Sequence, residues 1–260
     1  MSNELHVAFV SYGNDSIALL QVLADKGATG YALMSDTGWA APWWQERVEA
    51  GEAFARKLGF TPVRLDSEGL VQLVTRKKGW PRQGMQFCTE ELKIKPAMRW
   101  LDAVDPEKEA VCCVGVRREE SRARQAFPEH TEDSPRHGGR LLWAPLVRHT
   151  KVDRDVLVCR AGFDVLPHRS MECFPCVNSN RSDLRQLDEE RVAMIEAVEN
   201  GLGYTSEGKP RTMFRPYRHQ GAVGIREVWK WARSERGEYE APRGGCDSGF
   251  CETGDGDELD

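Results

Sequence analysis

Short apolar runs alternate with amphipathic segments through the first half of the chain. The runs at residues 7–10, 30–34, 61–65 and 110–116 are rich in aliphatic and β-branched side chains, and they predict buried strands. Between the runs, apolar residues recur at helical spacing, first over residues 17–23. Strands that alternate with helices in this way predict an α/β fold, a parallel twisted sheet flanked by helices. Ligands of such folds bind outside the carboxyl ends of the strands.

The later part of the chain reads as helices joined by loops. Helical spacing of apolar residues predicts helices over residues 43–58, 152–161, 184–200 and 224–236. Proline, glycine and charge dominate residues 125–141, for which we expect a surface loop.

The pattern divides the chain into three expected parts. They are an α/β nucleotide-binding domain over residues 1–165, a helical and cysteine-rich part over 166–252, and an acidic tail over 253–260.

Composition narrows the class of protein. The 260 residues are 40% hydrophobic, which is ample for a core, and the net charge is -5. The mean hydropathy of -0.56 and the lack of an apolar run of membrane-spanning length argue against a membrane protein. No basic-then-apolar leader pattern begins the chain, so we expect a cytoplasmic protein. Eight cysteines in such a compartment favour metal ligands, catalytic thiols or core residues over disulfides.

Residues 11–16 stand between the first apolar run and the first helical pattern. Small and hydroxyl-bearing residues here leave backbone N–H groups and the positive helix end facing one point, which favours phosphate. Ser11 and Ser16 can each donate a hydroxyl to a phosphate oxygen, and Asp15 can cap the helix. The loop is not a Walker A motif, because no Gly-Lys-Ser/Thr follows. A capped turn without a ligand is the alternative.

The loop reads Ser-x-Gly-x-Asp-Ser, which resembles the PP-loop of the N-type ATP pyrophosphatases and of their relatives, the phosphoadenosine phosphosulfate (PAPS) reductases. The usual form is Ser-Gly-Gly-Lys-Asp-Ser, and Tyr12 and Asn14 stand where Gly and Lys are common. The resemblance implies that the nucleotide is bound by Ser11, Gly13, Asp15 and Ser16.

The second predicted strand leads into Asp36, Thr37 and Gly38, which alone would be a capped turn. In the resembling family, an Asp-x-Gly at this strand end lies beside the nucleotide. The resemblance therefore implies that Asp36 and Gly38 border the nucleotide.

A further element reads Cys-Thr-x-x-Leu-Lys-Ile-x-Pro from Cys88. Thr89, followed by Glu91 and Leu92, predicts a helix start with Cys88 just before it, a position that lowers a thiol pKa. The element resembles the middle of PAPS-reductase-like proteins, which implies that Lys93 faces the nucleotide. The alternative for Lys93 is a solvated helix charge.

Arginines cluster directly after the fourth predicted strand. Arg117 and Arg118 stand where a guanidinium fork would meet phosphate or sulfate, although an ion-paired, solvated helix is the alternative. The run resembles the family's Gly-x-Arg-x-x-Glu-Ser-x-x-Arg element. The resemblance implies nucleotide contacts from Arg117, Glu120 and Arg124, and its position after the strand makes Arg118 a further candidate. It also marks Asp15, Arg117 and Lys93 as catalytic candidates.

Cys173 and Cys176 form a Cys-x-x-Cys, a spacing that lets two thiolates meet one metal or cluster. Cys88 and one of the tail pair, Cys246 or Cys251, can complete four ligands. Spacing alone does not choose between zinc and a [4Fe–4S] cluster; the resemblance implies the cluster. The remaining cysteines are expected to be structural: Cys112, Cys113 and Cys159.

Basic and aromatic residues interleave over residues 201–223. Such a segment can clamp a nucleic-acid strand, or it can pack on the core. Both alternatives stay open.

The family resemblance extends over residues 5–185 and is closest to phage PAPS-reductase-like proteins and DNA-phosphorothioation ATP pyrophosphatases. It implies an enzyme that uses ATP with Mg²⁺, releases pyrophosphate, adenylates an acceptor oxygen of DNA or RNA, and replaces AMP with sulfur through the cluster. The sulfur donor would be a protein such as a cysteine desulfurase, and a homodimer is left open. One alternative is a reductase that releases sulfite from PAPS or adenosine phosphosulfate (APS). The other is a nucleotide-binding phage or defence module without turnover.

Overall fold

The computed structural model describes residues 4–82, 84–216 and 219–240. It divides the chain into two compact units. The first unit comprises Met1–Leu70 and Cys88–Phe174, and the second comprises Val71–Phe87 and Pro175–Asp260. The boundary expected near residue 165 falls inside the first unit. Residues 71–87 belong to the second unit, which the apolar pattern of the sequence did not predict.

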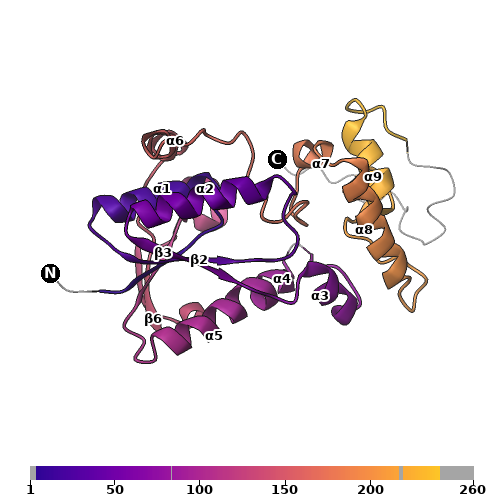
Figure 1. The fold of residues 1–260 in the computed structure, drawn as a ribbon. Coiled ribbons are helices and arrows are strands. Elements are labelled where there is room, and N and C mark those ends of the chain that lie inside the picture. Colours follow the sequence, from indigo (N-terminus) through magenta and orange to yellow (C-terminus); the bar gives the residue numbers. More distant parts are fainter. Residues whose placement is uncertain (1–3, 83, 217–218, 241–260) are drawn as a thin grey trace. The chain divides into compact units, whose positions relative to one another are not determined.

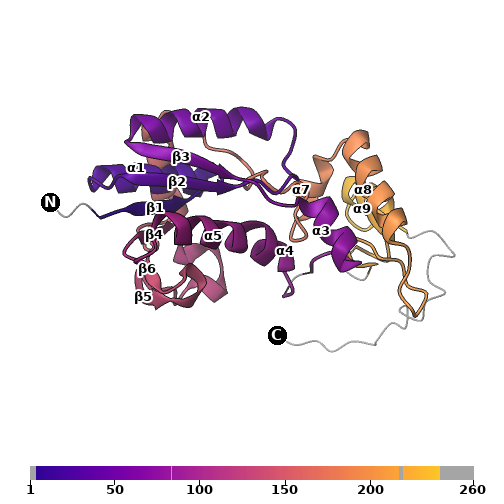
Figure 2. The same ribbon diagram turned by 60° about the horizontal axis from the view of Figure 1, so that its bottom comes forward.

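The first unit is built on a sheet flanked by helices (Figure 1). The sheet has six strands in the order β3-β2-β1-β4-β6-β5 (Figure 2). The strands are β1 (His6–Phe9), β2 (Gly30–Ser35), β3 (Phe60–Leu65), β4 (Val111–Val114), β5 (His130–Ser134) and β6 (Arg140–Trp143). All neighbours pair in parallel except β5, which pairs antiparallel with β6 at the edge. The predicted parallel α/β sheet is confirmed.

Helices cover both faces of this sheet. Figure 2 shows α1 (Asn14–Asp25) and α2 (Trp44–Lys57) on one face and α5 (Lys95–Val104) on the other. On the α5 face, Ala97 and Leu101 pack into one apolar cluster with strand residues such as Val7, Leu33 and Cys112. On the other face, α6 (Lys151–Arg160) packs against α1.

Cys112 and Cys113 lie inside β4 and are fully buried. Burial raises the pKa of the Cys112 thiol to about 12 and raises that of Cys113 as well. Both thiols are therefore protonated core residues, as predicted.

The stretch expected to be a surface loop over residues 125–141 instead contains β5 and much of the turn into β6, so that expectation is wrong. The sequence of β5 is polar and mostly exposed, because it is an edge strand, and it therefore lacks an apolar pattern. Gly138 and Gly139 both have positive φ angles and turn the chain between the two strands.

The second unit contains α3 (Leu70–Lys77) from Val71 onward, α7 (Arg181–Arg185), α8 (Glu189–Leu202) and α9 (Gly224–Arg233). The single helix predicted over residues 184–200 is wrong. Asp188 starts α8 by accepting the Arg191 N–H at 2.7 Å, and this local cap interrupts an otherwise continuous apolar period. No helix in the described part of the chain is both long enough and apolar enough to cross a membrane.

Candidate functional site

The loop between β1 and α1 is closed by its own hydroxyl groups. The Ser11 backbone N–H donates to the Ser16 Oγ atom at 2.9 Å, and the two hydroxyl oxygens lie 3.4 Å apart. Gly13 is the N-cap residue, with an extended backbone, and α1 begins at Asn14. The predicted strand–loop–helix is therefore confirmed, and it brings both serine hydroxyls together.

Tyr12 anchors this loop in the core. Its backbone is left-handed, with φ at 56°, and its side chain is fully buried against α2. A Cβ atom added to Gly51 would lie 2.2 Å from the Tyr12 ring, so glycine at that position makes room for the ring. The Tyr12 hydroxyl has no hydrogen-bond partner among the described residues, and burial followed by nearby Glu52 raises its pKa.

Asn14, which stands where lysine is common, has a structural role. Its buried side chain exchanges two hydrogen bonds with the backbone of Leu166, at 2.9 and 3.0 Å. These bonds tether the segment after α6 to the loop. The same segment approaches Gly13 so closely that an added Cβ atom would lie 3.1 Å from the Ser170 Cβ.

A cavity of about 260 Å³ opens at the carboxyl ends of β1 and β2, where the fold predicts a ligand. Its wall on the strand side includes Phe9, Val10 and Leu33. The polar lining residues are Ser11, Ser16, Ser35, Lys93, Arg136, His137 and Glu172. The hydroxyls of the loop thus share one cavity with cationic side chains, an arrangement that suits phosphate groups.

Lys93 reaches this cavity from a π-helical turn, Glu90–Ile94, which joins α4 (Phe87–Thr89) to α5. Such turns occur often at functional sites. The Lys93 ammonium lies 2.7 Å from a Glu172 carboxylate oxygen, and the Glu172 side chain is only 8% exposed. Glu172 therefore holds the ammonium in place inside the cavity.

Arg136 and His137 were not predicted as site residues. They lie on the turn between β5 and β6, and the Gly138–Gly139 pair was the available signal for that turn. The His137 Nδ1 atom lies 2.8 Å from the Ser134 hydroxyl. Burial, followed by the charges of Arg136 and Arg140, lowers the pKa of His137 to about 4, so the imidazole is neutral at pH 7.

Asp15 and Arg117, both predicted site residues, pair with each other beside the loop. Arg117 is buried, and its Nε atom donates to Asp15 Oδ1 at 2.7 Å. Arg154 lies 3.5 Å from the other carboxylate oxygen. Neither Asp15 nor Arg117 lines the cavity, so in this arrangement Arg117 fixes the loop's carboxylate.

The rest of the arginine element folds on itself. The Arg118 guanidinium donates to the Phe127 carbonyl at 3.0 Å. Glu120 accepts the Arg117 backbone N–H at 3.0 Å and forms an ion pair with Arg124. Arg118, Glu120 and Arg124 therefore lie outside the cavity lining.

Asp36, Thr37 and Gly38 form a capped turn at the end of β2. The Asp36 carboxylate accepts the Gly38 N–H at 2.8 Å. Thr37 is buried, donates its hydroxyl to the Glu172 carbonyl at 3.1 Å, and lies 3.7 Å from the Cys173 Sγ atom. The turn therefore holds the segment that carries Glu172 and Cys173.

The predicted cluster ligands are distributed over both units. Cys88 and Cys173 belong to the first unit and Cys176 to the second, while Cys246 and Cys251 lie outside the described residues. Cys88 lies within the short helix α4 rather than before a helix, because helical structure begins at Phe87. No three His, Cys, Asp or Glu side chains gather as a metal site among the described residues.

The donor atoms at these positions are thiol sulfurs, the ligand type of iron–sulfur clusters. The Cys176 sulfur accepts the Asn178 N–H at 3.5 Å, a contact that stabilises negative charge on a thiolate ligand. Cys159 is exposed on α6.

Two known proteins are similar to parts of this chain. A protein of Escherichia phage 186, described as an uncharacterized 37.8 kDa protein in the gpa 5' region, is 25% identical over 211 residues. The match covers 73% of this chain and 63% of that protein, so this chain spans less than two thirds of its relative. The crystal structure of PAPS reductase from Candida auris, a phosphate complex, is 15% identical with a TM-score of 0.44. That match covers 62% of this chain and 74% of the other.

The strongest assignment comes from a domain family. The phosphoadenosine phosphosulfate reductase domain matches residues 5–187, which include the β1–α1 loop, the Lys93 element, the arginine element and the Cys-x-x-Cys. The chain belongs to the phosphoadenosine phosphosulfate reductase domain family.

Proposed function

We propose that the first unit binds ATP with its phosphates against Ser11, Ser16 and Lys93, and that the enzyme adenylates a nucleic-acid acceptor before sulfur replaces AMP. The observation that carries the proposal is the cavity in which two loop hydroxyls, an ammonium and the Arg136 guanidinium meet at the strand ends. Hydroxyl and charged donors that converge on one point are the means by which proteins bind phosphate chains.

The proposed reaction has two displacements. The acceptor oxygen attacks the α-phosphorus of ATP, the bond to the β-phosphate breaks, and pyrophosphate leaves. A sulfur nucleophile then attacks the activated carbon or phosphorus, and AMP leaves with the acceptor oxygen. Negative charge grows on the leaving pyrophosphate in the first step, and Lys93 and the loop hydroxyls are positioned to stabilise it. Mg²⁺ bound with ATP would share this charge.

Two ion pairs fix the positions of charged side chains in and beside the cavity. Arg117 holds the Asp15 carboxylate at 2.7 Å, and Glu172 holds Lys93 at 2.7 Å. His137 lines the cavity with a neutral imidazole at pH 7, which can form hydrogen bonds but carries no charge.

We propose that Cys88, Cys173, Cys176 and one of Cys246 and Cys251 hold a [4Fe–4S] cluster, with zinc as the alternative. When bound, the cluster would supply a site for sulfur on its way from a donor such as a cysteine desulfurase. Thiolates are ligands common to both metals, so iron content is the decisive measurement.

A second candidate is a reductase that releases sulfite from PAPS or APS, and the family match favours it. A cysteine thiolate would attack the sulfur of the phosphosulfate, and the nucleotide would leave. The thiosulfonate formed would then release sulfite on reduction by a dithiol.

The experiment that separates the candidates uses anaerobic, cluster-loaded protein incubated with ATP and nucleic acid, or with PAPS and a dithiol. Pyrophosphate from ATP is the expected product. Sulfite from PAPS without pyrophosphate from ATP would favour the reductase. Nucleotide binding without either product would favour the module without turnover.

Iron content tests the cluster separately. Changing Cys88, Cys173 or Cys176 to alanine should abolish bound iron after anaerobic reconstitution. Cys159→Ala, an exposed cysteine on α6, is the matched control and should retain iron. Full iron retention in all three ligand variants would contradict the assignment.

A further inference from the structure

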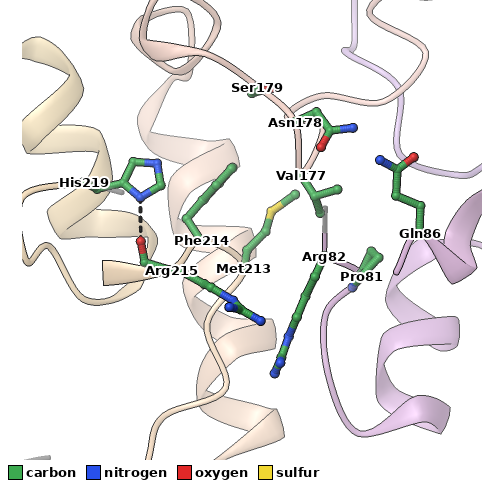
Figure 3. Close-up of a pocket in the computed structure, with 10 residues that line it drawn as sticks. All are labelled: Pro81, Arg82, Gln86, Val177, Asn178, Ser179, Met213, Phe214, Arg215 and His219. Atoms are coloured by element: carbon green, nitrogen blue, oxygen red, sulfur yellow. Dashed lines mark hydrogen bonds between the residues drawn. The ribbon is translucent and has the colours of Figure 1, made fainter. Parts of the chain in front are cut away.

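A second cavity lies wholly within the second unit, and the reaction proposed above does not use it. Its volume is about 290 Å³. The lining residues come from residues 81–86, 177–179 and 213–219: Pro81, Arg82, Gln86, Val177, Asn178, Ser179, Met213, Phe214, Arg215 and His219 (Figure 3). This volume lies just below the range for ligand pockets, which is about 300–1,000 Å³, so it suits one small group.

The cavity combines cationic, amide and apolar surfaces. The side chains of Arg82 and Arg215 come from opposite sides and both end in the lower middle of the view, whereas the amides of Gln86 and Asn178 lie above them (Figure 3). The Asn178 Oδ1 atom is buried and has no hydrogen-bond partner among the described residues. An unsatisfied buried acceptor favours a ligand that brings a donor N–H. Met213 and Phe214 supply buried apolar surface.

Hydrogen bonds fix the backbone at both arginines of the cavity, Arg82 and Arg215. The Arg82 and Met85 backbones exchange hydrogen bonds at 3.2 and 2.9 Å across a tight turn. The His219 Nδ1 atom lies 2.8 Å from the Arg215 carbonyl oxygen and fixes that side of the cavity (Figure 3). His219 in turn packs edge-on against Phe214 and Trp231. Both guanidinium groups therefore extend from fixed backbone positions.

Charge indicates what kind of ligand fits. Residues 71–87 contain four basic residues and no acidic one: Arg76, Lys77, Lys78 and Arg82. Residues 208–219 likewise contain basic residues and no acidic one: Lys209, Arg211, Arg215 and Arg218. Of these, Lys209 forms an ion pair with the preceding Glu207 at 2.7 Å. No Asp or Glu is among the residues that line the cavity. Two acid-free basic segments that meet at one cavity favour a polyanion over an isolated anion.

We propose that this cavity binds one nucleotide of a single-stranded nucleic acid. Arg82 and Arg215 contact the phosphodiester backbone, Asn178 accepts a hydrogen bond from the base edge, and the base packs on the apolar surface. Cationic residues combined with apolar or aromatic surfaces are the usual basis for single-strand binding. The inference deepens the proposed function, on which it rests for the assignment of the strand as the acceptor.

Binding is measured with the full chain and without ATP, so it does not depend on turnover. The probes are fluorescein-labelled single-stranded DNA and RNA of about twelve nucleotides, followed by fluorescence anisotropy from about 50 to 200 mM salt. The Arg82→Gln/Arg215→Gln variant should bind about tenfold more weakly than wild type. The slope of log affinity against log salt should decrease by about 0.7 for each phosphate that the variant no longer neutralises. Arg236→Gln, an exposed arginine of the same unit outside the lining, is the matched control and should bind as wild type does.

Asn178→Ala tests recognition of the base separately from the backbone. It should weaken binding of the intact strand about threefold and leave binding of an abasic strand unchanged. Circular dichroism establishes that each variant is folded, and both single arginine variants are tested beside the double one.

Three results would overturn the inference: no binding of either strand, equal weakening by Arg236→Gln, or competition by a free nucleoside monophosphate or an acidic phosphopeptide as strong as that by the strand. Pyrophosphate release from ATP without strand binding would overturn this inference alone. Strand binding without pyrophosphate release would overturn the proposed function alone.

Discussion

The two cavities differ in how their positive charge is held. In the first unit, Lys93 is paired with the buried Glu172, and the loop hydroxyls are fixed by each other. In the second unit, the lining contains two arginines and no carboxylate. A cavity in which a carboxylate accompanies the cationic side chains favours one ligand of defined shape, whereas a lining with arginines and no carboxylate, set in basic segments, favours a long anion.

The difference predicts how ligand binding at each cavity depends on salt concentration. Cationic side chains that neutralise phosphates of a nucleic acid release the counterions bound to it. The affinity of the second cavity for such a strand should therefore fall steeply with salt concentration. Ion pairs that are partly buried are screened less, so binding to the first cavity should respond weakly. Variants that affect one cavity and spare the other therefore test the comparison directly.

The largest effect is expected at the loop anchor of the first unit. Tyr12→Ala should lower the free energy of unfolding by about 3–5 kcal/mol, because it empties the space that Gly51 leaves for the ring. Tyr12→Phe should cost little or stabilise slightly, because it removes a buried hydroxyl without a partner among the described residues. Urea unfolding measures both. Tyr204→Ala, at a tyrosine that is 68% exposed, is the control.

Equal urea midpoints for Tyr12→Ala and wild type would refute the anchoring role. Strand binding in the second unit should persist in this variant under conditions in which it is still folded. Loss of ATP binding and strand binding together in folded Tyr12→Ala protein would argue that the two cavities are not independent.

A smaller effect, on ATP affinity, is expected at Lys93, which is paired with Glu172. Lys93→Gln should weaken ATP binding about 10- to 100-fold, the worth of a charge-assisted hydrogen bond. Lys95→Gln changes the same charge two residues away, at a lysine paired with Glu91 at 3.1 Å, and should bind ATP normally. Titration calorimetry gives both affinities. Equal affinities in the two variants would exclude Lys93 from the phosphate site.

The sheet and the loop could be predicted because their signals are local. Apolar runs marked β1 to β4, and the hydroxyl-bearing turn marked Ser11 and Ser16, which the structure places in one cavity with Lys93. Arg136 and His137 could not be found in this way, because they lie on a hairpin whose edge strand is polar. Glu172 was seen only as a neighbour of Cys173, since its pairing with Lys93 depends on tertiary structure.

Some predicted site residues make contacts with one another or within their own turn beside the cavity. Asp15 and Arg117 stand 102 residues apart in the sequence and pair with each other, a contact that no local pattern encodes. Asp36 caps its own turn. The motifs thus indicated residues that lie in or around one cavity, whereas the contacts among these residues depend on tertiary structure.

A modest effect is expected at the loop hydroxyl. Ser16→Ala removes the acceptor of the Ser11 N–H and one hydroxyl of the cavity, so ATP affinity should fall about 2- to 10-fold. The fold should persist, with a decrease below about 1.5 kcal/mol in the free energy of unfolding. Ser67→Ala, whose hydroxyl donates to the Asp36 carbonyl outside the cavity, serves as the comparison. Unchanged ATP affinity in Ser16→Ala would count against the phosphate role of the loop.

The smallest effect concerns the neutral imidazole of the first cavity. The pKa of His137 is about 4 in the folded protein, against a usual value of 6.5, because it is buried and lies near Arg136 and Arg140. Between these pH values the unfolded chain binds a proton that the folded chain does not, so the free energy of unfolding falls as the pH drops from 6.5 toward 4.

His137→Gln keeps a neutral, hydrogen-bonding side chain and should remove this part of the acid sensitivity. The difference between wild type and variant should be below about 1 kcal/mol at about pH 6 and should grow toward about pH 4. Urea unfolding at several pH values measures it, and subtracting the two curves cancels the carboxylates that titrate in the same range. ATP phosphates in the cavity would favour the protonated imidazole, so saturating ATP should shrink the difference. Parallel curves for the two proteins at all pH values would show that His137 is not buried in its neutral form.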